Sequence, residues 1–61
     1  MLIKDLLPVV VDKICIYVEV DCCEFNDLYQ GNPESVPKEL LERKIRTVGA
    51  KRKGILDVRV V

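Results

Sequence analysis

The sequence predicts an α+β fold: a small antiparallel sheet of three to four strands with one or two short helices packed on one face. Three observations support this class. One segment has an aliphatic residue at every second position, a proline-led segment has helical spacing, and the C-terminal part has the pattern of a hairpin. With 61 residues, the chain has room for a single domain that spans residues 1–61.

The first predicted element is a short helix near the N-terminus. With Asp5 as its N-cap, Pro8 falls at the third helical position, where a missing N–H costs nothing. Four apolar residues then share one face at helical spacing: Leu6, Leu7, Val10 and Val11. Three consecutive valines disfavour a helix because β-branched side chains lose rotamer freedom there. A strand that begins at Val9 is therefore the alternative.

The clearest predicted element is a strand over residues 13–22. Its apolar side holds Ile14, Ile16, Val18, Val20 and Cys22, and its other side holds Cys15, Tyr17, Glu19 and Asp21. A period of two with one apolar side indicates a half-buried strand. A second strand is expected through Leu28 and Tyr29 to Gly31, after a turn either at residues 26–27 or nearer Asp21.

A loop over residues 33–37 leads into the second predicted helix. Pro37 suits the first helical position, and Glu39 and Glu42 suit the positive N-terminal end. This helix has only about two turns, too few to persist alone, so it must dock on the sheet.

The C-terminal part is predicted to form a hairpin with strands over residues 45–50 and 55–61. Gly54 in the connecting loop is available for a positive φ angle. A valine-rich strand at the sheet edge is a site for pairing with a second copy, so Val58 and Val60 are predicted interface residues. Tyr17 and Tyr29 are candidates for the same role because tyrosine is favoured at interface centres. The alternative for both tyrosines is a partly buried ring between sheet and helix.

Charge is balanced overall but uneven along the chain. Residues 1–34 carry two basic and seven acidic side chains, a net of −5, whereas residues 35–61 carry eight basic and three acidic, a net of +5. The asymmetry favours a charged partner or a second copy of the chain. The alternative is that the two halves fold together and their charges mix over the surface.

Catalysis and metal binding are not expected. The chain has no histidine, the commonest general base near neutral pH. Cys22 and Cys23 lie between Asp21 and Glu24, and negative neighbours raise a thiol pKa. Three thiols, two of them adjacent, do not match the spacing of a zinc site or of a disulfide framework. We therefore expect no enzyme activity, no cofactor and no metal.

Basic residues cluster between positions 43 and 53 and are the candidate contacts for an anion or an acidic partner: Arg43, Lys44, Arg46, Lys51, Arg52 and Lys53. One hypothesis is an accessory protein that binds nucleic acid. It is not favoured, because no aromatic residue lies among these basic side chains to stack on the nucleobases of a single strand. Another is an oligomer that sequesters a small anionic ligand between its subunits.

Small size also favours self-association. A domain of this length buries only about 60% of its unfolded surface, and such chains are often stabilised by a partner. A homodimer or small homo-oligomer is the expectation. No signal peptide or apolar span of roughly 20 residues is visible, so the cytoplasm is the expected location, and no membrane partner is expected.

Several short segments resemble a group of very small, uncharacterised proteins from phages and prophages of Gram-positive bacteria. They are residues 3–7, IKDLL; residues 28–31, LYQG; residues 36–41, VPKELL; and the closing apolar hairpin. The Cys22-Cys23 pair and the basic run at residues 51–53 depart from the pattern. The resemblance implies a source rather than an activity, and no functional residues are carried over. It implies a host protein or defence component as partner, which this chain would inhibit by stoichiometric binding in the host cytoplasm.

Overall fold

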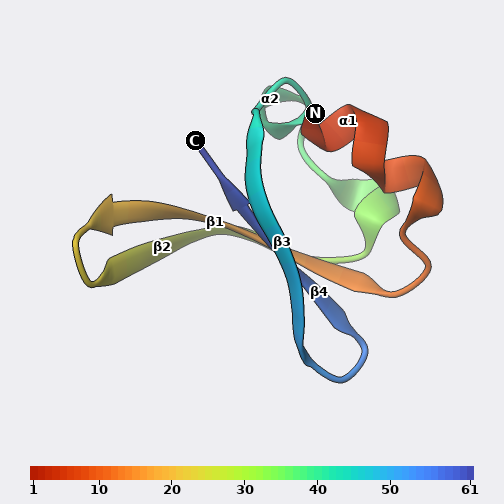
Figure 1. Ribbon diagram of the computed structural model, residues 1–61. Helices are drawn as coiled ribbons and strands as arrows, with labels where there is room; N and C mark the ends of the chain where they lie inside the picture. Colours follow the sequence, from red (N-terminus) through yellow and green to blue (C-terminus); the bar gives the residue numbers. More distant parts are fainter.

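A computed structural model describes residues 1–61 apart from the side chain of Lys51. Four strands form one sheet, and the short helical segments over residues 3–9 and 33–41 lie together on one side of it (Figure 1). The predicted α+β class, with short helices on one face of a small sheet, is confirmed. None of the described helices has the length and apolar character needed to cross a membrane.

The sheet is built from two hairpins that meet in its centre. The strands are β1 (Lys13–Asp21), β2 (Glu24–Gly31), β3 (Ile45–Arg52) and β4 (Ile55–Val60), in the order β2-β1-β4-β3. Both hairpins are antiparallel, but β1 and β4 run parallel, so the sheet is mixed rather than wholly antiparallel. The connection between the hairpins carries the chain to the far edge, where β3 starts, and β4 then returns beside β1.

This strand order corrects the prediction of a C-terminal edge strand. β4 is central, paired with β1 on one side and with β3 on the other. Val58 is fully buried and Val60 nearly so, both in the core of the protomer, which leaves neither available as an interface residue. Alternation in β4 predicted a buried side correctly, but it gave no information on which strands would be its neighbours.

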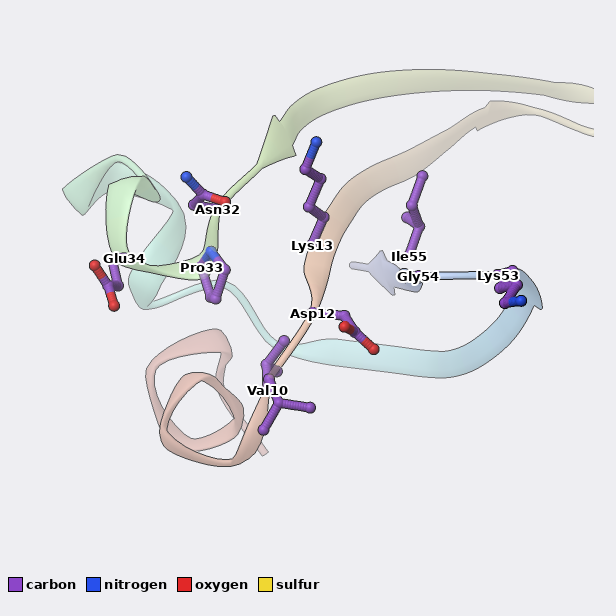
Figure 2. A pocket seen from close by; sticks show the side chains of 10 residues that line it. Val10, Asp12, Lys13, Asn32, Pro33, Glu34, Lys53, Gly54 and Ile55 are labelled. Atoms are coloured by element: carbon purple, nitrogen blue, oxygen red, sulfur yellow. The ribbon is translucent and has the colours of Figure 1, made fainter.

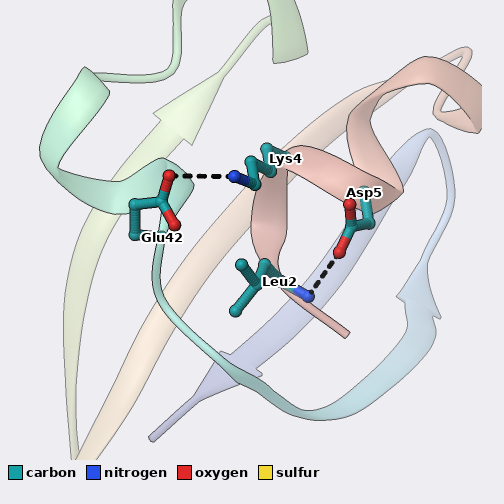
Figure 3. Close-up of polar contacts among 4 residues, drawn as sticks. All are labelled: Leu2, Lys4, Asp5 and Glu42. Carbon is teal, nitrogen blue, oxygen red and sulfur yellow. Dashed lines mark hydrogen bonds and ion pairs between the residues drawn. The ribbon is translucent and has the colours of Figure 1, made fainter.

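The N-terminal helical segment starts earlier than predicted. Helix α1 (Ile3–Leu6) is followed by the 3-10 helix η1 (Leu7–Val9), and Leu2 rather than Asp5 is the N-cap. The Asp5 carboxylate instead accepts a hydrogen bond from the Leu2 N–H at 3.1 Å (Figure 3), which satisfies one of the free donors of the first turn. The helix begins at Ile3 because that side chain is fully buried and its N–H bonds to the Arg43 carbonyl.

The second helical region is also shorter than predicted. It comprises the 3-10 helix η2 (Pro33–Ser35) and α2 (Lys38–Leu41), with Pro37 at the N-cap rather than at the first helical position. Lys4 of α1 and Glu42 after α2 form an ion pair at 3.0 Å that links the two helical regions (Figure 3).

Aliphatic side chains from the sheet and the helices form the core. The buried members are Ile3, Ile14, Ile16, Leu40, Val58 and Val60. Residues 14, 16, 58 and 60 belong to the parallel central pair, whose register places Ile14 opposite Leu56 and Ile16 opposite Val58. This side of the sheet, under the helices, is called the covered face below.

Each hairpin turn has a local cause. The first turn lies at Cys22-Cys23, where the Asp21 carboxylate accepts the Cys22 N–H at 2.8 Å, so the predicted alternative nearer Asp21 is the observed one. In the second turn Gly54 adopts φ 77°, as its position in the loop predicted.

Candidate functional site

The side of the sheet away from the helices carries the most distinctive group of side chains, and we call it the open face. Residues on β1 and β4 that alternate with the core residues project there, joined by residues from both outer strands. They line a shallow hollow of about 390 Å³, formed by Cys15, Tyr17, Phe25, Asp27, Arg52, Asp57 and Arg59.

Two aromatic rings and a guanidinium form one half of this hollow, which we call the aromatic cluster: Tyr17, Phe25 and Arg59. The rings meet edge to face, with centroids 5.5 Å apart and an interplanar angle of 87°. The Arg59 guanidinium carbon lies 5.0 Å from the Phe25 centroid and 5.8 Å from that of Tyr17, within cation–π range of both. Phe25 remains 51% exposed, so much of its ring faces solvent.

Arg59 has unused hydrogen-bonding capacity. Its Nε is buried and has no hydrogen-bond partner among the residues that the structure describes. The carboxylate of Asp57, two residues away on the same face, is bound by Arg52 instead. The rings hold the guanidinium in place while leaving it without an ion-pair partner within the described part of the protomer.

The other half of the hollow is a polar cluster of Cys15, Arg52 and Asp57. Asp57 is only 8% exposed, and Arg52 donates a hydrogen bond to its Oδ1 at 2.7 Å. Cys15 is 3% exposed, although no described helix covers this face. Burial raises the pKa of the Cys15 thiol, and a hydrogen bond with Arg52 opposes that rise only in part. The thiol therefore stays protonated near neutral pH and is a weak nucleophile.

The two tyrosines predicted as interface anchors have different positions. Tyr17 belongs to the aromatic cluster on the open face and is half-buried. Tyr29 lies on the covered face, packs against the core, and donates its hydroxyl hydrogen to the Asn32 carbonyl at 2.6 Å. Tyr29 thus matches the alternative of a ring that fills space between sheet and helices, whereas Tyr17 remains a candidate contact.

Apart from Lys51, the predicted basic residues do not converge on one site. Arg43 donates to the Val61 carbonyl at 2.9 Å, and Arg52 is paired with Asp57. Lys44, Arg46 and Lys53 are exposed and follow one another along β3 and its turn, an element of eight residues that extends about 25 Å. Lys51 was also predicted to contact an anion, and its side chain lies outside the described residues. Since the remaining bases are spread along the strand, they do not enclose a small anion within one protomer.

A larger hollow, of about 710 Å³, lies between the start of β1, the η2 region and the β3–β4 turn. Figure 2 shows Lys53 at the β3–β4 turn and Glu34 in η2 on opposite sides of the view, with Asp12 and Lys13 between them. Its lining includes two acidic and two basic side chains, so the charges balance and favour neither an anion nor a cation. We regard it as a surface depression between elements.

Cys22 and Cys23 are exposed at the tip of the β1–β2 hairpin, and all three cysteines are free. No group of three or more metal-ligating side chains is found in the described part of the chain.

Sequence reasoning missed Phe25, Asp57 and Arg59 as members of a site. A signal was available for two of them, because Asp57 and Arg59 alternate with Val58 and Val60 and must lie on the opposite face. Their approach to Tyr17 depends on the parallel pairing of β1 with β4, in which Tyr17 is opposite Arg59. That pairing leaves no local trace in the sequence.

Comparison of the chain with protein-family models, with curated proteins and with solved structures finds no match.

Proposed function

We propose that this chain is a small, non-enzymatic protein that binds another protein through the aromatic cluster on its open face. The observation that carries the proposal is the exposed Phe25–Tyr17–Arg59 arrangement on a sheet face that no described helix covers. Tyrosine and arginine in pockets near the centre of a contact dominate the energy of many interfaces. Both are pre-positioned here, so little side-chain entropy is lost on binding.

Charge around the cluster favours a basic partner surface. The β1–β2 hairpin carries both rings and also four acidic residues: Glu19, Asp21, Glu24 and Asp27. No lysine or arginine occurs between Lys13 and Lys38. Phosphates approaching the rings would meet these carboxylates, which disfavours stacking of nucleic-acid bases at this site. A protein with cationic side chains around an apolar centre is complementary to it.

The resemblance to small phage and prophage proteins makes a host protein the expected partner. Stoichiometric binding that blocks the function of that protein fits a chain that offers a surface and a protonated, buried thiol rather than a reaction centre. In this proposal the acidic residues of the β1–β2 hairpin steer the partner toward the open face, and the aromatic cluster provides most of the affinity.

The test is site-specific photo-crosslinking in the host cytoplasm. A photoreactive phenylalanine analogue is placed at position 25 or, as matched control, at position 11, where Val11 is 93% exposed and belongs neither to the aromatic cluster nor to the lining of its hollow. We expect position 25 to give a defined protein adduct and position 11 to give none. A nucleic-acid adduct, or equal adducts from both positions, would contradict the proposal.

The affinity of the purified adduct partner then measures the contribution of the cluster. Phe25→Ala is expected to weaken binding by roughly 30-fold, the effect of a hot-spot residue, whereas Val11→Ser leaves it unchanged. Calorimetry or fluorescence anisotropy gives both constants. Unchanged affinity of the Phe25→Ala protein would move the contact surface elsewhere.

A further inference from the structure

The two outer strands of the sheet each leave one side of their backbone unpaired. In the described part of the chain, β2 is hydrogen-bonded to β1 alone, and β3 is paired with β4 on its inner side. An open strand edge presents a row of N–H and C=O groups to which another strand can pair. The molecule therefore has two such edges, on opposite sides of one sheet.

The edge of β3 is closed at its beginning. The Ile3 N–H bonds to the Arg43 carbonyl and the Ile45 N–H to the Met1 carbonyl, while the Lys44 carbonyl accepts the Val61 N–H. Backbone groups of successive residues point to alternate sides of a strand, so the N-terminal residues cover the outer side while β4 lies on the inner side. The free part of this edge runs over residues 46–52.

The two free edges carry opposite charges. β2 contains Glu24 and Asp27 and no base, and both side chains are exposed. Residues 46–52 contain no acid, and the exposed Arg46 lies at the start of this stretch, with Lys53 directly after it. Arg52 contributes less, because Asp57 neutralises it.

Charged edges normally prevent sheets from joining, and here they do so selectively. A β2 edge meeting a second β2 edge places acid against acid, and two β3 edges place base against base, both of which are unfavourable. Only β2 against β3 brings opposite charges together. We propose that copies of this chain associate head to tail, with the β2 edge of one protomer paired with the free β3 edge of the next.

This pairing is heterologous, so it leads to a ring or an open chain of protomers rather than a two-fold dimer. Register shifts interrupt both β2 and β3, which makes each free stretch short and the association weak and concentration-dependent. It uses the strand edges and leaves the aromatic cluster exposed. It therefore goes beyond the proposed function, and either can fail without the other.

The test uses two variants, each with one edge disabled. Glu24→Lys with Asn26→Lys makes the β2 edge basic, and Arg46→Gln with Lys53→Gln removes the basic character of the β3 edge without making it acidic. All four native side chains are exposed, and none of them belongs to the aromatic cluster or lines its hollow. Circular dichroism checks that both variants fold like the native chain.

Sedimentation velocity over micromolar to millimolar concentrations gives the outcome. We expect the native chain to form species larger than a dimer and to dissociate in molar sodium chloride, which screens the edge charges. Each variant alone should associate at least about tenfold more weakly, because like charges would face one another or the attraction would be lost. An equimolar mixture of the two retains one native junction, so it should form a one-to-one dimer and no larger species.

Three results would overturn the proposal. They are a native chain that stays monomeric throughout, a single variant that still dimerises, and a mixture that fails to form the one-to-one dimer although both variants fold. Persistence of one variant as a dimer would indicate a like-with-like edge or a contact through the open face. Phe25 lies on β2, so an adduct at position 25 between two copies of this chain would report on the β2 edge, whereas an adduct with a different protein reports on the proposed function. The mass of the adduct separates the two.

Discussion

The two faces of the central strand pair differ in composition although they alternate along the same residues. On the covered face, β1 and β4 contribute only aliphatic side chains, and Ile14, Ile16 and Val58 are fully buried. On the open face, the same strands contribute a thiol, a carboxylate, a phenol and a guanidinium. One face is buried by helices, whereas the other is shielded only by its own side chains.

This difference separates the residues that stabilise the fold from those that are available for binding. Burial under the helices removes apolar surface from water, at about 25 cal/mol for each Å². The open face obtains its order from cation–π contacts and one ion pair, each of which is worth far less. Substitutions on the two faces should therefore have different effects on the free energy of unfolding.

The largest expected effect is on the covered face. Ile16→Ala should lower the free energy of unfolding by about 2 to 5 kcal/mol, since it deletes fully buried atoms and leaves a cavity. That loss is comparable to the whole stability of a small domain, so Ile16→Val, with an expected cost of about 0.5 to 1.5 kcal/mol, provides a variant that stays folded. Urea unfolding followed by circular dichroism measures both.

The matched substitution on the open face is Phe25→Ala. Because half of this ring is already exposed, the expected cost is about 1 kcal/mol or less. If Phe25→Ala proved as destabilising as Ile16→Ala, the open face would be a second core, and the distinction between the two faces would fail.

An intermediate effect is expected at the ion pair of the open face. Arg52→Ala leaves the nearly buried Asp57 carboxylate without its partner, which should cost about 1 to 3 kcal/mol. Asp57→Asn should cost less, because it removes the buried charge and leaves Arg52 half exposed, where water can solvate it. A double-mutant cycle from urea unfolding compares the two. Equal costs, or a larger cost for Asp57→Asn, would show that the carboxylate is better solvated than its burial indicates.

Features of the fold that depend on neighbouring residues were predictable from the sequence, whereas those that depend on long-range strand pairing were not. The alternation of residues 14–20 predicted β1 and the burial of Ile14 and Ile16, although Val20 near the end of the strand is 65% exposed. Gly54 predicted the second turn. Both predictions depend on neighbouring residues only. The parallel pairing of β1 with β4 joins residues about 40 positions apart, and it decided three points: the mixed sheet, the burial of Val58 and Val60, and the position of Arg59 beside Tyr17.

The candidate site was predictable in part for the same reason. Tyr17 and Arg52 were named from residue type, whereas the contribution of Phe25 and Arg59 needed the strand order. The basic residues of β3 formed a cluster in the sequence but lie along a strand, where neighbours in sequence spread out instead of converging.

The smallest expected effect is a pH dependence from the open face. Burial raises the pKa of Cys15 in the folded chain, so above about pH 8.5, the ordinary pKa of a thiol, the unfolded chain ionises at this position before the folded one does. The folded chain then binds more protons than the unfolded chain, and the free energy of unfolding falls as pH rises. Cys15→Ala should abolish this contribution, so its stability should decline less steeply between neutral pH and about pH 10.

The native chain and the Cys15→Ala variant both contain the exposed Cys22 and Cys23. Both also contain the Lys4–Glu42 ion pair, which raises the pKa of Lys4, so the stability that this pair contributes is lost at alkaline pH in both proteins. The comparison therefore isolates Cys15. Urea unfolding in reducing buffer at several pH values gives the two slopes, and the constant loss from the smaller alanine side chain shifts one curve without changing its slope. If the free energy of unfolding of the two proteins changed in parallel with pH, the Cys15 thiol would reach water as readily in the folded chain as in the unfolded one. The open face would then be less well shielded by its own side chains than the 3% exposure of Cys15 indicates.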